Sequence, residues 1–247
     1  MKNRIRLFDT QADPWTMEQT VTEIGRRIDK GIFTQHVVVN VAKIVSMRKD
    51  PELRESVEGC DIINIDGMGV VWGARLLGLG VPERVAGIDL FYNLLKLAEK
   101  KGYQVFFLGA KPDVVKRAVS NVLRMHPDIK VAGFHHGYFW DNEQEVVEEI
   151  RNSGARMLFV AITSPKKERF INRWKARLGV SLAMGVGGTF DILAGEAKRA
   201  PIWMQKAGLE WLYRLLQEPG RMWKRYLGTN AAFGWMLIKG LLTRKGH

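Results

Sequence analysis

The first group that could do chemistry is the carboxylate of Asp66. An apolar stretch at residues 61–65 runs into Asp66-Gly67-Met68-Gly69, where glycines can open a helix after a buried strand. Ligands of α/β proteins bind outside the carboxyl ends of the strands. A carboxylate placed there can take the proton of a hydroxyl nucleophile as a general base. The pattern fits equally an aspartate that only caps the following helix, so both roles stay open.

A glycine-rich turn at residues 185–191 is the second candidate. Its glycines would let a diphosphate approach backbone N–H groups at the start of a helix. The match to a dinucleotide fingerprint is loose, because Phe190 stands where the third Gly or Ala belongs. The turn therefore predicts a nucleotide diphosphate as substrate and no NAD cofactor. The candidate binding residues are Gly187, Gly188 and Asp191, with Gly109 in a weaker glycine turn.

Basic side chains near the C-terminus form the third candidate. Arg214 is followed by Arg221, Lys224 and Arg225, and the last three share one helical face. One guanidinium group can donate two hydrogen bonds to the oxygens of a phosphate. This cluster therefore suits a diphosphate, free or lipid-linked. A solvated basic face, with Glu210 and Glu218 as local partners of Arg214, explains the pattern about as well.

The sequence offers no expected metal site. It lacks the Asp-x-Asp pair with which many sugar-nucleotide transferases hold a divalent metal, and it lacks a Walker-type lysine loop. The single cysteine, Cys60, cannot build a cysteine-rich zinc site. Adjacent histidines at 135 and 136 would point to opposite faces of an extended segment, which favours a structural role.

The elements that must position these groups alternate between strand and helix. Several short runs are almost continuous in Val, Ile, Leu and Phe, as in parallel strands buried on both faces. Amphipathic segments between them predict helices, most clearly at residues 112–125. The pattern predicts an α/β fold: a Rossmann-like, mostly parallel sheet flanked by helices, with an all-helical C-terminal appendage. The predicted strands are 36–41, 61–65, 104–109, 129–134, 157–163 and 180–185.

Residues 198–247 differ from the α/β catalytic core predicted for residues 1–197. These 50 residues hold ten Lys and Arg against two Glu, so they carry +8 of the net charge of +12, and four of the eight tryptophans. Basic residues interleaved with tryptophan suit nucleic acid or an anionic membrane surface. No helix-turn-helix, RNP or zinc-finger pattern supports nucleic acid as a partner, so the segment is predicted to associate with a membrane and leaves room for a homo-oligomer.

Three helices are predicted in this appendage, at residues 201–217, 219–227 and 230–242. The last has an apolar stripe of Phe233, Met236, Leu237, Gly240 and Leu241, which could lie in a membrane interface or cover the core. No apolar run approaches the ~20 residues needed to span a bilayer, and the first eight residues lack a signal-peptide pattern. The predicted location is the cytoplasm, peripheral on the inner face of the cell membrane. The 46% hydrophobic and 26% charged composition excludes a disordered chain.

Taken in order, the motifs of this chain resemble those of the WecG/TagA/CpsF family of bacterial glycosyltransferases, glycosyltransferase family 26. The resemblance covers about residues 36–227, and it is specific because eight short motifs occur in the family's order. They are Asn40; 66–72 (DGMGVVW); 82–89 (PERVAGID); 107–109 (FLG); 164–168 (SPKKE); 185–191; 199–201 (RAP); and 210–219 (EWLYRLLQEP).

This resemblance implies an inverting, metal-independent transferase. The family moves an N-acetylmannosamine-type sugar from UDP to the 4-hydroxyl of N-acetylglucosamine on undecaprenyl diphosphate, for teichoic acid or a related surface polysaccharide. Its proposed base falls on Asp66. The arginines thought to close over its active site fall on Arg214 and Arg221, with Lys224 or Arg225 as a third. Arg84 and Asp89 become candidates for sugar or phosphate contacts.

Two positions depart from the family pattern in the substrate pocket. Val38 stands where many members have threonine, two residues before Asn40, and Lys167 stands where many have glutamine. Asn40 and Lys167 remain predicted substrate-binding residues, but the donor sugar is left open. The alternatives are another donor of the UDP-ManNAcA or UDP-glucose type for capsule or exopolysaccharide, and a non-catalytic membrane adaptor.

Overall fold

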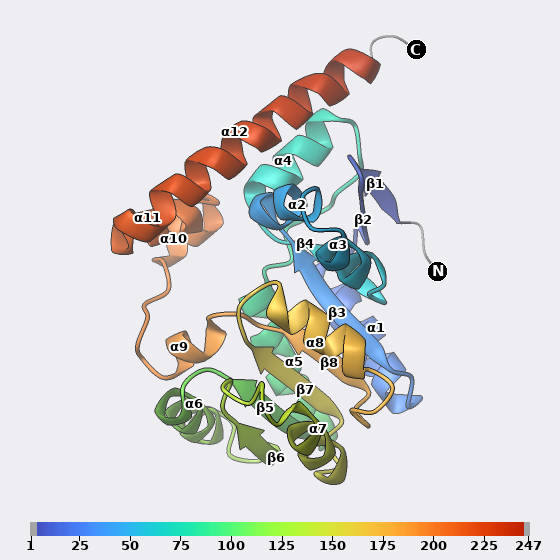
Figure 1. The fold of residues 1–247 in the computed structure, drawn as a ribbon, viewed down its shortest axis with the longest axis vertical. Helices are drawn as coiled ribbons and strands as arrows, with labels where there is room; N and C mark the ends of the chain where they lie inside the picture. The colour runs from blue at the N-terminus through green and yellow to red at the C-terminus, as the bar shows by residue number, and fades with distance from the viewer. Residues whose placement is uncertain (1–3, 245–247) are drawn as a thin grey trace.

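The chain forms a six-stranded parallel sheet with helices on both faces (Figure 1). This computed structural model describes residues 4–244, and the side chains of residues 221, 222, 225 and 244 lie outside that description. The strand order is β4-β3-β8-β7-β5-β6. All six predicted strands and the Rossmann-like α/β class are confirmed. The strands are β3 (Thr34–Val39), β4 (Ile62–Ile65), β5 (Gln104–Gly109), β6 (Lys130–His135), β7 (Met157–Ala161) and β8 (Leu182–Gly185).

Each face of the sheet has its own hydrophobic core. One core packs Phe91, Phe107, Phe159 and Phe190 between the sheet and one group of helices. Two further clusters lie under the helices of the other face. The first group is α1 (Met17–Asp29), α5 (Gly87–Lys101), α6 (Pro112–Met125) and α9 (Thr189–Leu193). The other face carries α2 (Val41–Met47), α3 (Pro51–Glu58), α7 (Glu143–Asn152) and α8 (Lys166–Trp174).

Local sequence signals explain where these helices begin. Pro112 occupies the first turn of α6, where a missing N–H costs least, and the apolar positions of α6 then face the sheet. Thr16 caps α1, because its side chain accepts from the Gln19 N–H while the Gln19 side chain accepts from the Thr16 N–H. The sequence analysis did not predict α1, nor the antiparallel hairpin of β1 (Ile5–Leu7) and β2 (Thr10–Ala12).

The C-terminal helices are divided differently from the prediction. The helix predicted at 201–217 is two helices, α10 (Ile202–Lys206) and α11 (Glu210–Gln217). Gly208 separates them with a φ of 73°, and a Cβ there would lie 2.3 Å from Met68 Cγ. The two helices predicted after residue 218 are in fact one continuous helix, α12 (Pro219–Arg244).

Helix α12 covers the core with the stripe that was a candidate for membrane contact. Phe233 and Met236 are buried in the same cluster as Val70 and Val71 of α4 (Met68–Leu76). Gly73 makes the close approach of α4 and α12 feasible, since a Cβ there would lie 3.0 Å from Leu237 Cδ2. Figure 1 shows α12 lying across α4 and above α2. The stripe therefore stabilises the fold, and the opposite side of α12 faces solvent.

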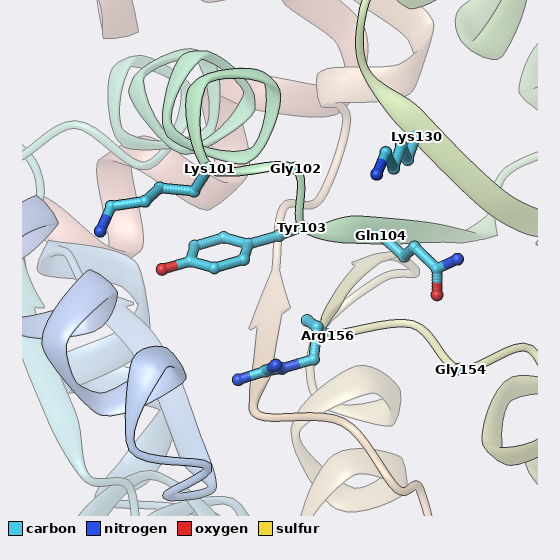
Figure 2. A pocket seen from close by; sticks show the side chains of 7 residues that line it. All are labelled: Lys101, Gly102, Tyr103, Gln104, Lys130, Gly154 and Arg156. Atoms are coloured by element: carbon cyan, nitrogen blue, oxygen red, sulfur yellow. The ribbon is translucent and has the colours of Figure 1, made fainter.

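A cavity of about 410 Å³ lies where β5 and β6 begin, at the amino-terminal edge of the sheet (Figure 2). The basic residues that line it are Lys101, Lys130 and Arg156. Lys101 pairs with Asp29, and Arg156 donates to the Ile28 carbonyl. Figure 2 shows Gln104 turned away from Lys101 and Tyr103, so the polar groups do not converge on one point. This cavity is not where the predicted site residues gather.

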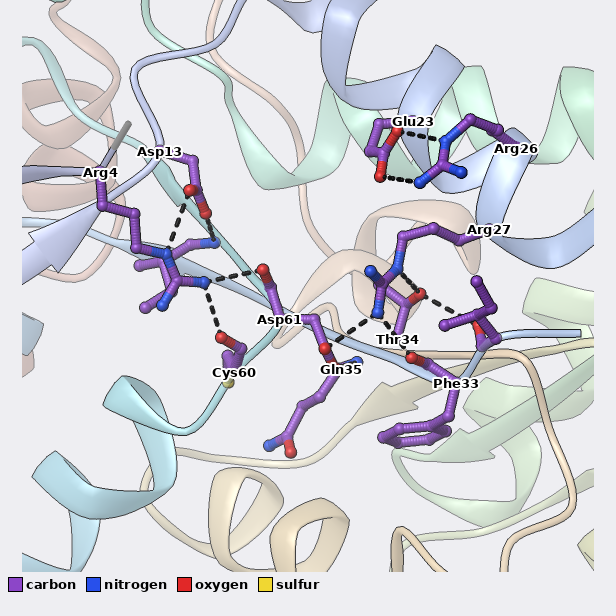
Figure 3. A network of polar contacts seen from close by, with 12 residues as sticks. Arg4, Asp13, Glu23, Arg26, Arg27, Phe33, Thr34, Gln35, Cys60 and Asp61 are labelled. Atoms are coloured by element: carbon purple, nitrogen blue, oxygen red, sulfur yellow. Dashed lines mark hydrogen bonds and ion pairs between the residues drawn. The ribbon is translucent and has the colours of Figure 1, made fainter. Parts of the chain in front are cut away.

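The same edge of the sheet holds a polar network that attaches the hairpin and α1 (Figure 3). Arg4 Nε pairs with Asp13 Oδ1 over 3.1 Å, and its Nη2 donates to the carbonyls of Cys60 and Asp61. Asp13 Oδ2 accepts from the Ile63 N–H over 2.8 Å. The carboxylate of Asp61 accepts from Arg27 and from the Gln35 N–H. This edge therefore has a structural role.

Replacing Asp13 with alanine is expected to lower the free energy of unfolding by about 3–5 kcal/mol, because it leaves Arg4 buried without its charge partner. The side chains of this pair are only 10% and 1% exposed. Urea denaturation measures the change. The control is Arg26→Ala, which removes an exposed pair with Glu23 and should cost less than about 1 kcal/mol. Equal small losses in both variants would contradict the structural role of the buried pair.

Candidate functional site

Asp66 lies at the carboxyl end of β4, at the edge where α/β proteins bind ligands. Its N–H donates to the Val39 carbonyl over 2.8 Å, which continues the pairing of β3 and β4. Gly67, with a φ of 107°, then turns the chain into α4 and is itself the N-cap of that helix. The Asp66 carboxylate instead accepts from the Gly87 N–H at the start of α5, over 3.2 Å. The predicted alternative, in which Asp66 caps the helix that follows it, is therefore wrong.

The proton affinity of Asp66 is raised. Burial raises the pKa of its carboxyl group, while the charge of Arg84 and the Gly87 N–H act in the opposite direction. The charge of Glu210 raises the pKa further, and that of Arg214 lowers it. A carboxylate of raised pKa is a stronger base than an exposed aspartate, and such groups concentrate at catalytic sites.

The loops after β3 and β8 lead to opposite faces of the sheet, because α2 and α9 belong to different cores. Neighbouring strands that diverge in this way leave a crevice at their carboxyl ends. Asn40 follows directly after β3, and its side chain accepts from the Lys43 N–H over 2.9 Å as the cap of α2. A Cβ on Gly67 would lie 3.7 Å from that of Asn40. Asn40 and Asp66 are therefore neighbours at this edge.

Arg84 and Asp89 lie beside the site, but the structure pairs each with a charged residue of the C-terminal segment. Arg84 Nη1 lies 2.6 Å from Glu210 Oε2, and Asp89 makes two hydrogen bonds with Arg199. Glu210 also accepts from Arg199. The hydrogen bonds of Glu210 therefore go to Arg84 and Arg199, and not to Arg214 as in the predicted alternative of a local pair. Sequence reasoning considered Glu210 only as a local partner of Arg214 and assigned no role to Arg199, although both lie in quoted family motifs.

A small cavity between α11 and the core contains Lys198, Arg199, Glu210 and Arg214 among its lining residues. Arg214 also lies within electrostatic range of Asp66. The charges of the predicted residues Arg84 and Arg214 thus both act on the Asp66 carboxylate, Arg84 from the segment before α5 and Arg214 from α11. A surplus of positive charge beside a base suits a substrate that carries phosphate.

Lys167 belongs to a second charged cluster, at the end of β8. Lys43 Nζ and Lys167 Nζ lie 2.7 and 3.2 Å from Glu168 Oε1. Although burial alone would raise it, the pKa of Glu168 is held at about 2 by these two ammonium groups. The stem of Lys167 lies over Gly185, where a Cβ would be 2.7 Å from its Cδ. Glu168 is a further charged group that sequence reasoning left without a role.

The glycine turn after β8 has the predicted conformation of a tight turn into a helix. Gly187 has a φ of 55°, Gly188 is the N-cap of α9, and Asp191 lies in its first turn. Phe190 fills the core beside Phe107, which explains why no third glycine stands there. Position 109 has no room for a side chain, because a Cβ there would lie 2.4 Å from the Ala161 carbonyl oxygen on the neighbouring strand β7.

Of the remaining predicted cations, Lys224 is exposed on α12, with its ammonium 5.7 Å from the ring centre of Trp223. The side chains of Arg221 and Arg225 lie outside the described residues. Within residues 4–244, no three His, Cys, Asp or Glu side chains are grouped so that they could hold a metal ion. His135 instead hydrogen-bonds through Nδ1 to the His136 carbonyl.

Large apolar side chains are exposed mainly on α4 and the C-terminal helices. In the described part of the chain no helix is long and apolar enough to span a membrane. The outer side of α12 nevertheless presents tryptophan and aliphatic side chains, opposite the buried stripe. The exposed large apolar residues of α4 and the C-terminal helices are Trp72, Leu76, Ile202, Trp203, Trp211, Leu216, Trp223, Leu227, Trp235, Ile238 and Leu242.

Comparison with known proteins identifies the family of this chain. The model of the glycosyl transferase WecG/TagA/CpsF family matches residues 5–247. A Bacillus subtilis N-acetylglucosaminyldiphosphoundecaprenol N-acetyl-beta-D-mannosaminyltransferase is 38% identical over 200 residues, which cover 81% of this chain and 77% of that protein. A Bacillus spizizenii protein of the same name is 35% identical over 225 residues, 91% of this chain and 85% of its own. This chain therefore belongs to the WecG/TagA/CpsF family of glycosyl transferases.

Proposed function

We propose that this chain transfers N-acetylmannosamine, or a related N-acetylhexosamine, from UDP to the 4-hydroxyl of N-acetylglucosamine on undecaprenyl diphosphate. The product would be a lipid-linked disaccharide for teichoic acid or another surface polysaccharide. The acceptor and the sugar are taken from the names of the two Bacillus relatives. The observation that carries the proposal is the placement of Asp66, a carboxylate of raised pKa at the crevice of the sheet and within reach of basic charge.

In the proposed reaction Asp66 removes the proton of the acceptor hydroxyl as that oxygen attacks the anomeric carbon. The new bond forms on the face opposite the bond to UDP, which breaks in the same step, so the configuration inverts. The electron pair of the broken bond leaves with the UDP diphosphate, and the proton stays on Asp66 until it passes to solvent.

The charge that develops on the leaving diphosphate needs fixed positive partners. Arg84 and Arg214 would supply it, and this is supported by the effect that the charges of both have on Asp66. N–H groups of the turn at Gly187 and Gly188 would add donors at the neighbouring strand β8. We infer that these groups do the work of a divalent metal, so transfer should proceed in the presence of EDTA.

The C-terminal segment is proposed to hold the enzyme on the inner face of the cell membrane as a peripheral protein. Residues 198–247 would form the membrane-associating appendage of a catalytic core at residues 1–197. Exposed tryptophans on α10 and α12 could enter the interface, while Lys206, Lys224 and Lys239 would meet anionic headgroups. Such a location brings the crevice close to its lipid-linked acceptor.

A radiolabelled-sugar assay with a short-chain lipid-diphosphate acceptor tests the proposal. Product is expected with UDP-N-acetylmannosamine, at a rate that an excess of EDTA leaves unchanged. The donor panel includes UDP-ManNAcA, because Lys167 is a cation where many family members carry an amide. Absence of transfer from every UDP-sugar would contradict the proposed function.

A thermal-shift measurement distinguishes the enzyme from a non-catalytic adaptor. UDP at about 100 times its Kd should add about 2.7 kcal/mol to the free energy of unfolding and raise the melting temperature, whereas NAD should not. A protein that responds to neither nucleotide would favour the adaptor.

A further inference from the structure

Four charged side chains join α5 and the segment before it to the C-terminal segment. Glu210 of α11 accepts through Oε2 from Arg84 Nη1 over 2.6 Å and through Oε1 from Arg199 Nε over 3.2 Å. Arg199 in turn donates to both carboxylate oxygens of Asp89, over 2.5 and 2.8 Å. One carboxylate of the appendage therefore holds two guanidinium groups, one of them 126 residues away in the sequence.

This carboxylate also lies near the proposed base. The charges that act on Asp66 come from Arg84 in the segment before α5 and from Glu210 and Arg214 on α11, and the start of α5 adds the Gly87 N–H. Arg84 donates its hydrogen bond to Glu210, although its positive charge also lowers the pKa of Asp66. The side chains of Arg84 and Glu210 are only 14% and 21% exposed, so water screens their charges incompletely.

We propose that Glu210 is a positioning residue, which holds Arg84 and Arg199 beside the reaction centre and keeps Arg84 from pairing with Asp66. This rests on the proposed function, in which Asp66 is the base. A carboxylate paired directly with a guanidinium binds protons weakly. By engaging Arg84, Glu210 leaves Asp66 basic while the positive charge stays near the diphosphate. Because Glu210 belongs to α11, the base has its full strength only when the appendage is docked.

The test compares Glu210→Gln with Glu210→Asp in the full-length protein. In E210Q the negative charge is lost and Arg84 is released, and both changes lower the pKa of Asp66. The titration of the Asp66 carboxyl carbon, followed by ¹³C NMR without substrate and assigned with D66N, should move to lower pH. The acid limb of the kcat/KM profile should move in the same direction, and kcat should fall.

E210D keeps the charge but shortens the side chain, so it should reach only one of the two arginines. Its Asp66 titration should move less than that of E210Q, while kcat still falls. Glu196→Gln is the matched control, because it removes one negative charge from an exposed pair with Arg117. That variant should leave the Asp66 titration, kcat and the melting temperature unchanged.

An unchanged Asp66 titration in E210Q would overturn the proposal even if activity were lost, since a purely structural tie lowers stability and turnover without altering the base. If E210Q does not fold, E210D decides, and a wild-type kcat in E210D would also overturn it. A wild-type protein that transfers no sugar would refute the proposed function instead. The NMR titration needs no substrate, so it distinguishes these two failures.

Discussion

Replacing Asp66 with asparagine is expected to lower kcat by about 10²–10⁴-fold, which is the usual contribution of a general base. Asparagine keeps the shape of the side chain and can still accept from the Gly87 N–H, but it cannot take the proton of the acceptor hydroxyl. The affinity for UDP should change little, because the base acts on the acceptor. Initial rates at saturating donor and acceptor measure the effect.

The pH dependence of the wild-type enzyme gives a second sign of the same role. The base works only when deprotonated, so the rate should rise as pH passes upward through the raised pKa of Asp66. This rise should be absent from the residual activity of D66N. Asp113→Asn, which changes an exposed aspartate on α6, should behave as wild type. Near-normal turnover by D66N would remove Asp66 from the mechanism.

Replacing Trp203 and Trp235 together with serine is expected to weaken binding to anionic vesicles by about 10³-fold. These side chains are 64% and 68% exposed, on α10 and the outer side of α12. A tryptophan buries about 150–250 Å² when covered, so inserting about half of it at roughly 25 cal/mol per Å² contributes about 2 kcal/mol each. Sedimentation with phosphatidylglycerol vesicles measures the binding.

The matched control for this prediction replaces exposed apolar residues elsewhere. Leu123 and Met125 on α6 are 43% and 48% exposed and lie outside the apolar surface of α4 and the C-terminal helices. Serine at both positions should leave vesicle binding unchanged. Equal losses in the two double variants would show that general hydrophobicity, rather than the appendage, binds the membrane.

The sheet was predictable because its strands are buried on both faces. Every residue of β7 is buried, and a continuous apolar run such as 157–161 has few other stable uses in an α/β chain. The hairpin of β1 and β2 was not predicted, because its three-residue strands carry too little pattern. Their position depends on the ion pair of Arg4 and Asp13, which no local sequence pattern predicts.

The candidate site was predictable where one residue follows one strand. Asp66 could be found from its place after an apolar run, but its bond to Gly87 could not, because that contact joins two separate loops. The pairing of Arg84 with Glu210 depends on how α11 docks, which periodicity does not determine. The same limit explains the stripe on α12: an apolar face shows that something covers it, and only the fold shows that α4 does.

The place of β8 in the sheet has a consequence for how the protein is made. β8 lies between β3 and β7, so it alone joins the pair β3–β4 to the group β5, β6 and β7. Among the six strands of the sheet, β8 is the last to leave the ribosome, because it comes last in the sequence. Until residue 185 has emerged, the nascent chain holds two partial sheets with open edges, and such edges are prone to aggregate. The two partial sheets can therefore join into one folded unit only after β8 has been synthesised.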